Sequence, residues 1–465
     1  MTENQADTII SNCYVITMND RREYFERGAV AILGNKISAV GHNDEILQRF
    51  NAKRTIDAGG GIVHPGFIDT HVHFMNTARG AFSDTSDLSS GMNIYRRWWD
   101  SVEEEDERAS TLLNCLEMLS NGTTCFLEAG TLQFPDASAE AAETVGIRGF
   151  IGDPFLWDLP ASAQTYDMAR APRDNARSLK LLGSQLKRNN GEPLIRGCVV
   201  LFGLGSASDE LMRAAKEIAD TNKVVFSQHQ SFDRHDSGSD ESRLGKRALC
   251  HFAENDLIGE NCTFSHMNDL NADEVDVIRQ SGMSVAWCPG TAMSLGTGAT
   301  IHGAHLEMVR AGVNTSLASD GAASGCRYDI GLQGLLALLA SREKAQSKSA
   351  FSCEDVLELA TRGGAKAVGM EHEIGSIEPG KFADIVIRST DLPEAQPVTD
   401  PVQALIYSCG SKSVATVLVN GEVVWSDGGP AKVDAPMVYD LARTSRRRMW
   451  EKLSLSRTSK WPLVS

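Results

Sequence analysis

The stretch GFIDTHVHF at residues 66–74 decides how the rest of the chain is interpreted. It is a short apolar run that ends in polar side chains, which is typical of a buried strand reaching an open edge. Residues i and i+2 of a strand point to the same face, so the imidazoles of His71 and His73 leave this run together. Two converging neutral imidazoles can begin a zinc-type site, although an H-x-H pair alone is also common by accident.

Seven further apolar runs follow this one, and helical stretches with apolar residues at i, i+3 and i+4 separate most of them. Together the runs span a length close to the ~250 residues of a (β/α)₈ barrel. We therefore predict an α/β fold with a (β/α)₈ TIM barrel over residues 63–378, and an open doubly wound sheet is the alternative. The seven runs are TTCFLEAG (123–130), IRGFIGDPF (147–155), LIRGCVVLFG (194–203), KVVFSQHQS (223–231), CTFSHMND (262–269), SVAWCPG (284–290) and NTSLASDG (314–321).

Both ends of the chain are rich in β-branched residues and tight turns, as in GAVAILGNKISAVG (28–41) and SVATVLVNGEVVWSDG (413–428). Neither end has enough residues for a good core of its own. We predict that residues 1–62 and 379–428 pair into one discontinuous, β-sandwich-like domain. Residues 429–465 are predicted to form a C-terminal helical tail.

The composition excludes several classes of protein. The chain has 45 basic and 61 acidic residues, a net charge of −16, and this field repels nucleic acids and anionic membranes. No apolar run is long enough to span a bilayer and no signal peptide is visible, so we expect a cytoplasmic protein. The ten cysteines form no C-x-x-C pair, which indicates reduced, mostly buried thiols.

Three more potential ligands stand at the ends of predicted barrel strands. His229 closes the fifth run, His266 the sixth, and Asp320 the eighth. The carboxyl ends of barrel strands carry the active site, so these side chains are expected to meet His71 and His73. Most of the other histidines lie away from such ends and are interpreted as ordinary surface or core residues.

Two long polar segments, 75–100 and 231–246, follow the first and fifth runs and are predicted to be loops that cover the site. The first contains Trp98 and Trp99, and these aromatics would suit an apolar substrate.

The runs HPGFIDTHVHF (64–74), SHMND (265–269) and ASDGAAS (318–324), together with His229, resemble the amidohydrolase superfamily of metal-dependent hydrolases, and the resemblance covers essentially the whole chain. It implies one divalent transition metal ion, with zinc favoured and cobalt, manganese or iron possible. The resemblance assigns two catalytic roles: Asp320 shuttles the proton, and His266 contacts the nucleophile or the substrate. The implied metal ligands are His71, His73, His229 and Asp320.

Two departures from the family pattern refine this expectation. Binuclear members carry a lysine or glutamate on the fourth strand, but LIRGCVVLFG ends in neither, so a single metal is favoured. Deaminase and triazine-hydrolase branches usually carry a glutamate three residues after the fifth-strand histidine, where this chain has Phe232. Asp233, Asp236 or Glu128 could stand in for that acid.

We therefore predict a mononuclear hydrolase that cleaves a small carbonyl substrate (a carbamate, thiocarbamate, urea or amide) with metal-bound hydroxide. The alternative is a metal-dependent aminohydrolase (deaminase) or chlorohydrolase of a nitrogen heterocycle. A barrel that has lost its metal and serves as a scaffold is the third hypothesis, and the intact ligand set argues against it.

Within the superfamily the sequence looks most similar to the phenylurea and thiocarbamate herbicide hydrolases, molinate hydrolase among them. That likeness implies xenobiotic degradation, a small-molecule substrate and a homo-oligomer (dimer or tetramer). Glu128, Trp157 and Phe232 are the candidate pocket residues.

Overall fold

The computed structural model describes residues 4–82, 87–160, 166, 174–322, 327–456 and 461. Each of the eight apolar runs contains at least one strand, and these strands form two five-stranded sheets in which all the pairs are parallel. One sheet has the order β14-β5-β6-β7-β8 and the other the order β9-β10-β11-β12-β13. The strands are β5 (Phe67–His73), β6 (Thr123–Glu128), β7 (Arg148–Ile151), β8 (Ile195–Gly197), β9 (Val199–Gly203), β10 (Phe226–Gln230), β11 (Cys262–His266), β12 (Ser284–Trp287), β13 (Thr315–Leu317) and β14 (Asp320–Gly321).

The fourth and eighth runs carry the hydrogen bonding from one sheet to the other. In the fourth run, the Cys198 amide donates to Ile151 O of β7 (3.2 Å), while the next amide, of Val199, donates to Val225 O just before β10 (3.0 Å). In the eighth run, β13 pairs with β12 and β14 pairs with β5. The order of the strands in space therefore follows their order in the sequence.

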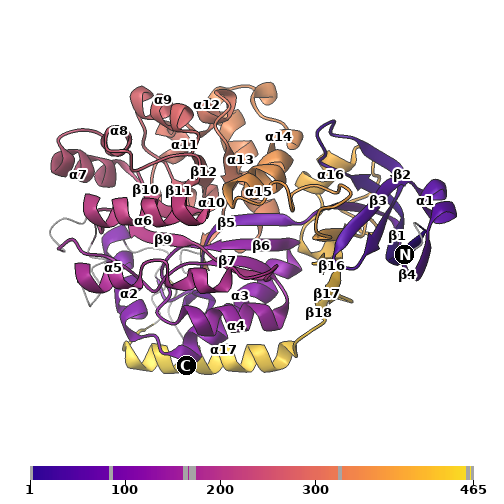
Figure 1. The fold of residues 1–465 in the computed structure, drawn as a ribbon, viewed down its shortest axis with the longest axis horizontal. Coiled ribbons are helices and arrows are strands. Elements are labelled where there is room, and N and C mark those ends of the chain that lie inside the picture. Colours follow the sequence, from indigo (N-terminus) through magenta and orange to yellow (C-terminus); the bar gives the residue numbers. More distant parts are fainter. Residues whose placement is uncertain are drawn as a thin grey trace.

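Helices follow most of these strands and lie outside the two sheets (Figure 1). Three of them, α3, α4 and α6, begin where an acidic, hydroxyl or proline residue favours a helix start. The helices of this part are α2 (Leu88–Ser101), α3 (Glu104–Ser120), α4 (Pro135–Val145), α5 (Asn175–Leu181), α6 (Asp209–Asn222), α7 (Arg234–Leu244), α8 (Ala248–Glu254), α9 (Ala272–Ser281), α10 (Pro289–Ser294), α11 (Ala299–His302), α12 (His305–Arg310), α13 (Ile330–Ala345), α14 (Cys353–Glu358) and α15 (Gly364–Ala367).

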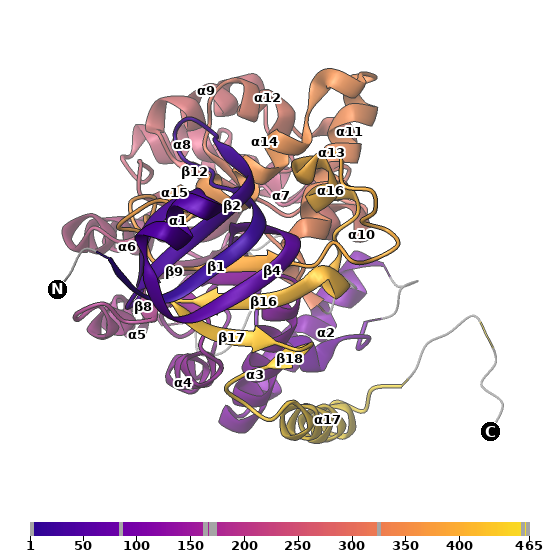
Figure 2. The same ribbon diagram turned by 90° about the vertical axis from the view of Figure 1, so that its right-hand side faces the viewer.

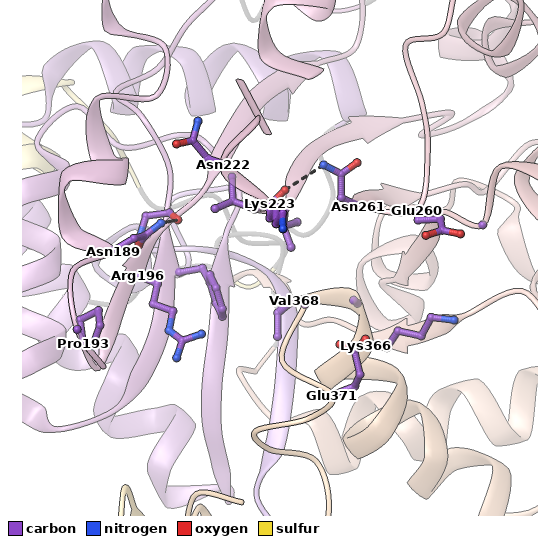
Figure 3. Close-up of a pocket in the computed structure, with 18 residues that line it drawn as sticks. Asn189, Pro193, Arg196, Asn222, Lys223, Glu260, Asn261, Lys366, Val368 and Glu371 are labelled. Atoms are coloured by element: carbon purple, nitrogen blue, oxygen red, sulfur yellow. Dashed lines mark hydrogen bonds between the residues drawn. The ribbon is translucent and has the colours of Figure 1, made fainter. Parts of the chain in front are cut away.

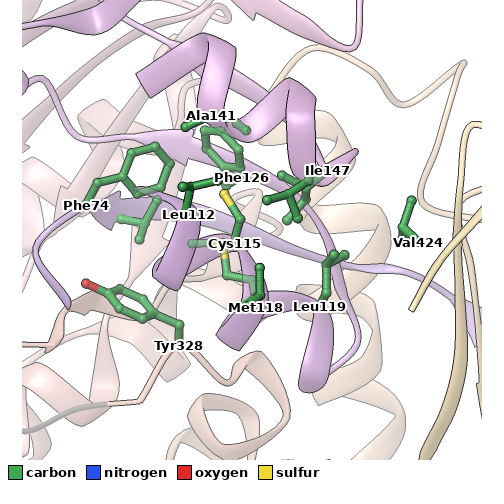
Figure 4. Close-up of a cluster of buried hydrophobic side chains, with 14 of the residues drawn as sticks. Phe74, Leu112, Cys115, Met118, Leu119, Phe126, Ala141, Ile147, Tyr328 and Val424 are labelled. Atoms are coloured by element: carbon green, nitrogen blue, oxygen red, sulfur yellow. The ribbon is translucent and has the colours of Figure 1, made fainter. Parts of the chain in front are cut away.

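The largest core cluster packs α3 and α4 against the outer face of β5 and β6 (Figure 4). Leu112, Cys115 and Leu119 of α3 contact the same cluster as Phe126 of β6, and each is at most 7% exposed. Burying a large apolar side chain contributes about 1.5–3 kcal/mol, so this cluster fixes the strands that carry the first histidines. Tyr328 lies in the same cluster, and its hydroxyl donates to the carbonyl oxygen of His73 (2.5 Å).

Segments from both ends of the chain share an eight-stranded sheet, which lies at one side of the molecule in Figure 1 and faces the viewer in Figure 2. Its order is β18-β17-β16-β15-β4-β1-β2-β3, so β4 from the first end pairs directly with β15 from the second. The elements are β1 (Gln5–Ile16), β2 (Tyr24–Leu33), β3 (Lys36–His42), α1 (Asn43–Arg49), β4 (Asn51–Pro65), β15 (Ile385–Arg388), α16 (Pro401–Tyr407), β16 (Val414–Val419), β17 (Glu422–Ser426) and β18 (Gly429–Pro430).

The chain ends in a long helix, α17 (Ala435–Lys452), which packs against α3 and α2 (Figure 1). Its Arg448 forms an ion pair with the buried carboxylate of Asp106 in α3. Near its end, the Lys452 ammonium donates to Ser101 O (2.9 Å), and Arg97 of α2 donates to Leu453 O (2.6 Å). The last turn of α17 therefore holds the carboxyl end of α2.

Two segments that the sequence predicted to be loops contain helices instead. The segment 75–100 contains most of α2, and the segment 231–246 contains α7. Asp87 and Asp233 accept hydrogen bonds from the amides three residues on, and such caps start helices inside sequences that look uniformly polar. Among the described residues, no helix is both long enough and apolar enough to cross a membrane.

No disulfide joins the nine cysteines that the structure describes, and all but the half-buried Cys250 are buried. Cys326 and residues 323–324 of the ASDGAAS motif lie outside the described residues.

Candidate active site

The carboxyl ends of the parallel strands bring together the five side chains that the sequence singled out. His73 Nε2 lies 3.2 Å from Asp320 Oδ1 and 3.1 Å from His229 Nε2. His71 Nε2 lies 3.9 Å from the same carboxylate oxygen, and the ring of His266 stacks at 5.3 Å from that of His229. All five side chains are buried.

The Nδ1 atoms of two of these histidines are held by groups outside the cluster. His229 Nδ1 lies 2.6 Å from Phe202 O, and a carbonyl can only accept, so this nitrogen carries the hydrogen. His73 Nδ1 lies 2.9 Å from Thr131 Oγ1, whose own hydrogen goes to the Glu128 carboxylate (3.0 Å). His73 is therefore a donor at Nδ1 as well, and both rings present a bare Nε2 to the cluster.

This arrangement fits a divalent cation. The Nε2 lone pairs of His73 and His229 face each other beside the Asp320 carboxylate, which is repulsive unless a positive charge lies between them. His71 Nδ1 bonds Ser265 Oγ (2.6 Å), and among the described residues its buried Nε2 has no hydrogen-bond partner. Three imidazole nitrogens and one carboxylate are the donor set that zinc and similar ions prefer.

Burial favours the neutral form of three of the imidazoles, those of His71, His229 and His266. It lowers the pKa of His71 and of His229 far below the ordinary value, and the neighbouring histidines add to the effect. Burial also lowers the pKa of His266 to about 4, against the opposing charge of Asp320. For Asp320, burial favours the neutral acid, but the surrounding histidines oppose this effect and hold its pKa well below the usual range. The site thus combines imidazole nitrogens with an ionised carboxylate.

The backbone around the site is held in an unusual conformation. His266, Met267 and Asp320 have φ values of +74°, +54° and +63°, a left-handed region that costs non-glycine residues about 1–3 kcal/mol each. Such strain persists only where the surrounding structure imposes it, and it gathers at functional sites. Here the left-handed backbone conformation directs the side chains of His266 and Asp320 toward the same cluster.

His305 holds the backbone of His266 and was not predicted from the sequence to be part of the site. Its Nε2 donates to His266 O (2.7 Å), and its ring stacks on Trp287 at 4.5 Å with an 8° angle between planes. Burial lowers the pKa of His305 to about 4, so it acts as a neutral donor. Because His305 follows a loop and not a strand, its sequence position gave no signal of this contact.

Asp69 is a second supporting residue that sequence reasoning missed. Its carboxylate accepts from the Ser319 amide (3.0 Å) and the His71 amide (3.4 Å), and so ties the first run to the eighth. Burial raises the pKa of Asp69 to about 7. The available signal was an acidic residue inside an otherwise apolar strand, two positions before the first histidine.

The catalytic cluster opens into a small cavity of about 40 Å³. Helix α2 forms one wall, the segment after β9 a second, and α10 a third. Besides His73, His229, His266 and Asp320, the lining side chains are Met92, Tyr95, Trp99, Phe202, Leu204, Phe232, Thr291 and Leu295.

Of the three candidate pocket residues, only Phe232 lines this cavity. Its ring lies 4.9 Å from that of His266, edge to face. Trp157 is buried in the apolar cluster behind the wall. Glu128 lies behind Thr131 and accepts hydrogen bonds from the amides of Gly130 (2.8 Å) and Thr131 (3.1 Å).

The acids that could have replaced the deaminase glutamate point elsewhere. Asp233 caps α7 and accepts from the hydroxyl of Tyr166, and Asp236 accepts from the Phe232 amide (3.0 Å). Within the described part of the cavity wall, Asp320 is the sole carboxylate.

A larger cavity of about 600 Å³ lies at the opposite ends of the strands (Figure 3). It is lined by Arg196 of β8, by residues that precede β10 and β11, and by Lys366 and Val368. The amino-terminal face of a barrel serves stability, and this cavity contains no cluster of metal ligands among its described residues.

Comparison with known proteins shows the fold and the family of this chain. The model of the amidohydrolase family matches residues 62–424. A 5-methylthioadenosine/S-adenosylhomocysteine deaminase of Syntrophobacter fumaroxidans is 31% identical over 92% of this chain and 94% of its own length. An adenosine deaminase from Xanthomonas campestris with bound zinc superposes with a TM-score of 0.89 at 25% identity, covering 96% of this chain and 99% of the other. Atrazine chlorohydrolase from Arthrobacter aurescens, solved with zinc, shares the fold with a TM-score of 0.83 at 23% identity, covering 94% and 100%.

These relatives correct the narrower resemblance to molinate hydrolase, because they are deaminases and a chlorohydrolase, the classes that the sequence left as the alternative. They confirm the expectation of a divalent metal cofactor, with zinc the ion bound in the neighbouring structures. On the family model and on these relatives, the chain belongs to the amidohydrolase family of metal-dependent hydrolases.

Proposed function

We propose that this protein hydrolyses a small apolar carbonyl compound, such as a carbamate, thiocarbamate, urea or amide. The observation that carries the proposal is Phe232, which is 3% exposed and occupies the wall beside His266. A heterocycle needs a proton on its ring nitrogen before water can add, and a phenyl ring cannot supply it. A carbonyl carbon is already electrophilic.

His71, His73, His229 and Asp320 would hold the ion. When bound, a divalent ion supplies a Lewis acid that activates water at neutral pH. Glu128 accepts from Thr131, which in turn holds the His73 ring, and Asp69 accepts from the backbone amide of His71. Glu128 and Asp69 are therefore positioning residues.

Asp320 and His266 would handle the proton. Asp320 Oδ accepts a proton from the attacking water and returns it to the departing amine or thiolate. The hydroxyl of the water thus ends on the carbonyl carbon and its proton on the leaving group. Neutral His266, whose Nδ1 has no partner within the described structure, would orient the water or the developing oxyanion.

The apolar side chains that line the cavity limit the polarity of the substrate. A charged group placed against Phe202, Leu204 and Phe232 would lose its hydration without gaining a partner, which costs several kcal/mol. A cavity of about 40 Å³ is far smaller than the roughly 300 Å³ or more of a typical ligand pocket, so we expect the wall that α2 helps to form to move when a substrate enters.

Deamination of an adenine nucleoside is the second candidate, because the 31% identical relative is a deaminase of this kind. Against it, the described lining offers no carboxylate besides Asp320 to protonate a ring, and its largely apolar wall offers few partners for ribose hydroxyls.

The test is product identification with the zinc-loaded protein. Thiocarbamates, carbamates and phenylureas should release amine or thiol, while 5-methylthioadenosine, adenosine and a chlorotriazine should remain intact. Asp320→Asn serves as the inactive control for contaminating hydrolases. Ammonia release from a nucleoside, with carbonyl substrates inert, would establish the second candidate instead.

We also infer that the two parallel sheets close into one (β/α)₈ barrel through the split fourth and eighth runs. The shared hydrogen bonds at Cys198 and Val199 support this, as do the solved relatives. Residues 1–62 with 379–428 are proposed as the composite β-domain, 63–378 as the barrel, and 429–465 as a tail.

A further inference from the structure

We propose that His266, Cys288 and Asp320 form a second metal site, which binds a thiophilic divalent ion such as Cd²⁺ and inhibits the enzyme. Their ligand atoms all lie within 4.8 Å of one another, and all three side chains are buried. The inhibition part of this proposal rests on the proposed role of Asp320 as the proton carrier.

Cys288 is placed for this role by the seventh run. It directly follows β12 and precedes Pro289 at the start of α10, and it is 1% exposed. Its Sγ lies 3.9 Å from Ala286 O. The Nδ1 atom of the buried His266 has no hydrogen-bond partner in the described structure. One unpartnered imidazole nitrogen beside one thiol is an arrangement that points to a ligand.

The donor set selects the ion. Sulfur, nitrogen and oxygen together favour soft or borderline ions such as Cd²⁺ and Zn²⁺ over Mg²⁺ or Mn²⁺. Binding replaces the thiol proton, which is released to solvent, and needs no oxidant or reductant.

In this assignment the two metal sites share only Asp320. His71, His73 and His229 belong to the catalytic site, and His266, which also lies close to His71 and His229, joins Cys288 in the second site. We expect the catalytic site to fill first. A carboxylate with both oxygens on metal ions has no free position for a proton, so filling the second site would stop turnover.

The experiment titrates the zinc-loaded protein with Cd²⁺ and follows the ultraviolet cadmium–thiolate absorption band, released zinc and turnover. The wild type should develop the band at one Cd²⁺ per chain without releasing zinc and should lose roughly tenfold or more of its activity, a difference of about 1.4 kcal/mol per decade. Cys288→Ser should show neither the band nor the loss relative to its own rate without Cd²⁺. Cys250→Ser removes a more accessible thiol and should behave as the wild type.

Several outcomes would overturn the proposal: an equal band in Cys288→Ser, zinc release matching the added Cd²⁺, or a rise in activity. If Cys288→Ser fails to fold, ¹¹³Cd NMR of the wild type decides, because a single sulfur ligand shifts the resonance away from that of an all nitrogen and oxygen site. The band and the NMR signal do not depend on substrate. Binding without inhibition would therefore contradict the role of Asp320 and leave the second ion site standing.

Discussion

At the scale of single residues, neighbouring groups determine how the histidine side chains of the site are oriented and protonated. Thr131 and Phe202 O fix which nitrogen of His73 and of His229 carries hydrogen, and this leaves two bare Nε2 atoms facing each other at 3.1 Å. The metal ligands are thus selected by their neighbours before any ion arrives.

Replacing His266 should separate metal binding from catalysis. We expect His266→Ala to keep its metal while kcat falls by roughly 10²–10⁴, the range for a lost acid–base or oxyanion partner. Metal analysis and steady-state kinetics of the same preparation provide the measurement. Loss of the ion from this variant would make His266 a ligand.

Replacing His305 should affect catalysis through the backbone of His266. His305→Phe keeps the stack on Trp287 but loses the hydrogen bond to the strained carbonyl, a net contribution of about 1 kcal/mol. We expect a drop in kcat of roughly tenfold at unchanged KM, partly rescued in His305→Gln. Equal kinetics for all three proteins would show that the contact is structural only.

Residue positions were predictable where strand geometry decides them. The i and i+2 spacing places His71 and His73 in one cluster, and the run ends place His229, His266 and Asp320 beside them. Glu128 also ends a run, but its side chain turns toward local amides. The direction of one side chain depends on neighbours that are distant in sequence, so the alternation of a strand cannot determine it.

At the scale of elements, α2 forms the wall of the cavity and α17 holds α2. The polar composition of 75–100 suggested a loop, yet α2 buries Met92, Trp98 and Trp99 on one face. The contact between α17 and α3 joins segments more than 300 residues apart, and sequence pattern alone gives no sign of it.

The buried carboxylate of Asp106 should be the main attachment of α17. It caps its own helix and accepts from Ser445 Oγ (2.8 Å) and from Arg448. We expect Asp106→Ala to lower the free energy of unfolding by about 1–3 kcal/mol and to raise KM as α2 loosens. Denaturant unfolding and kinetics measure both. The matched control is Asp440→Ala, an exposed carboxylate on α17, which should change stability by less than about 0.5 kcal/mol.

At the scale of the whole molecule, buried polar contacts join the terminal sheet to the parallel sheets. Arg148 of β7 pairs with Asp384 (2.7 Å), with both side chains at most 3% exposed. Arg388 of β15 bonds His64 Nε2 (3.0 Å) in β4 and Asn121 O (2.9 Å) just before β6. The two strand-rich ends could be predicted from the sequence, but these single side-chain contacts could not.

The His64 contact predicts a pH dependence of stability. Burial, and then the charge of Arg388, lowers the pKa of His64 well below 6.5, so the folded protein keeps this ring neutral while the unfolded chain takes up a proton. The free energy of unfolding should therefore fall as pH drops below about 6.5, by up to about 1.4 kcal/mol per unit for this residue. His64→Gln should flatten part of that slope in denaturant unfolding between pH 7 and pH 5. An unchanged slope would mean that His64 is charged in the folded state.

The measurement that tests the central claim most directly is the activity of metal-free protein as zinc is added back. One ion held by His71, His73, His229 and Asp320 predicts that activity rises linearly, reaches its maximum at one equivalent per chain, and is absent in His73→Ala. A maximum that requires two equivalents, or full activity without metal, would contradict the single-metal account.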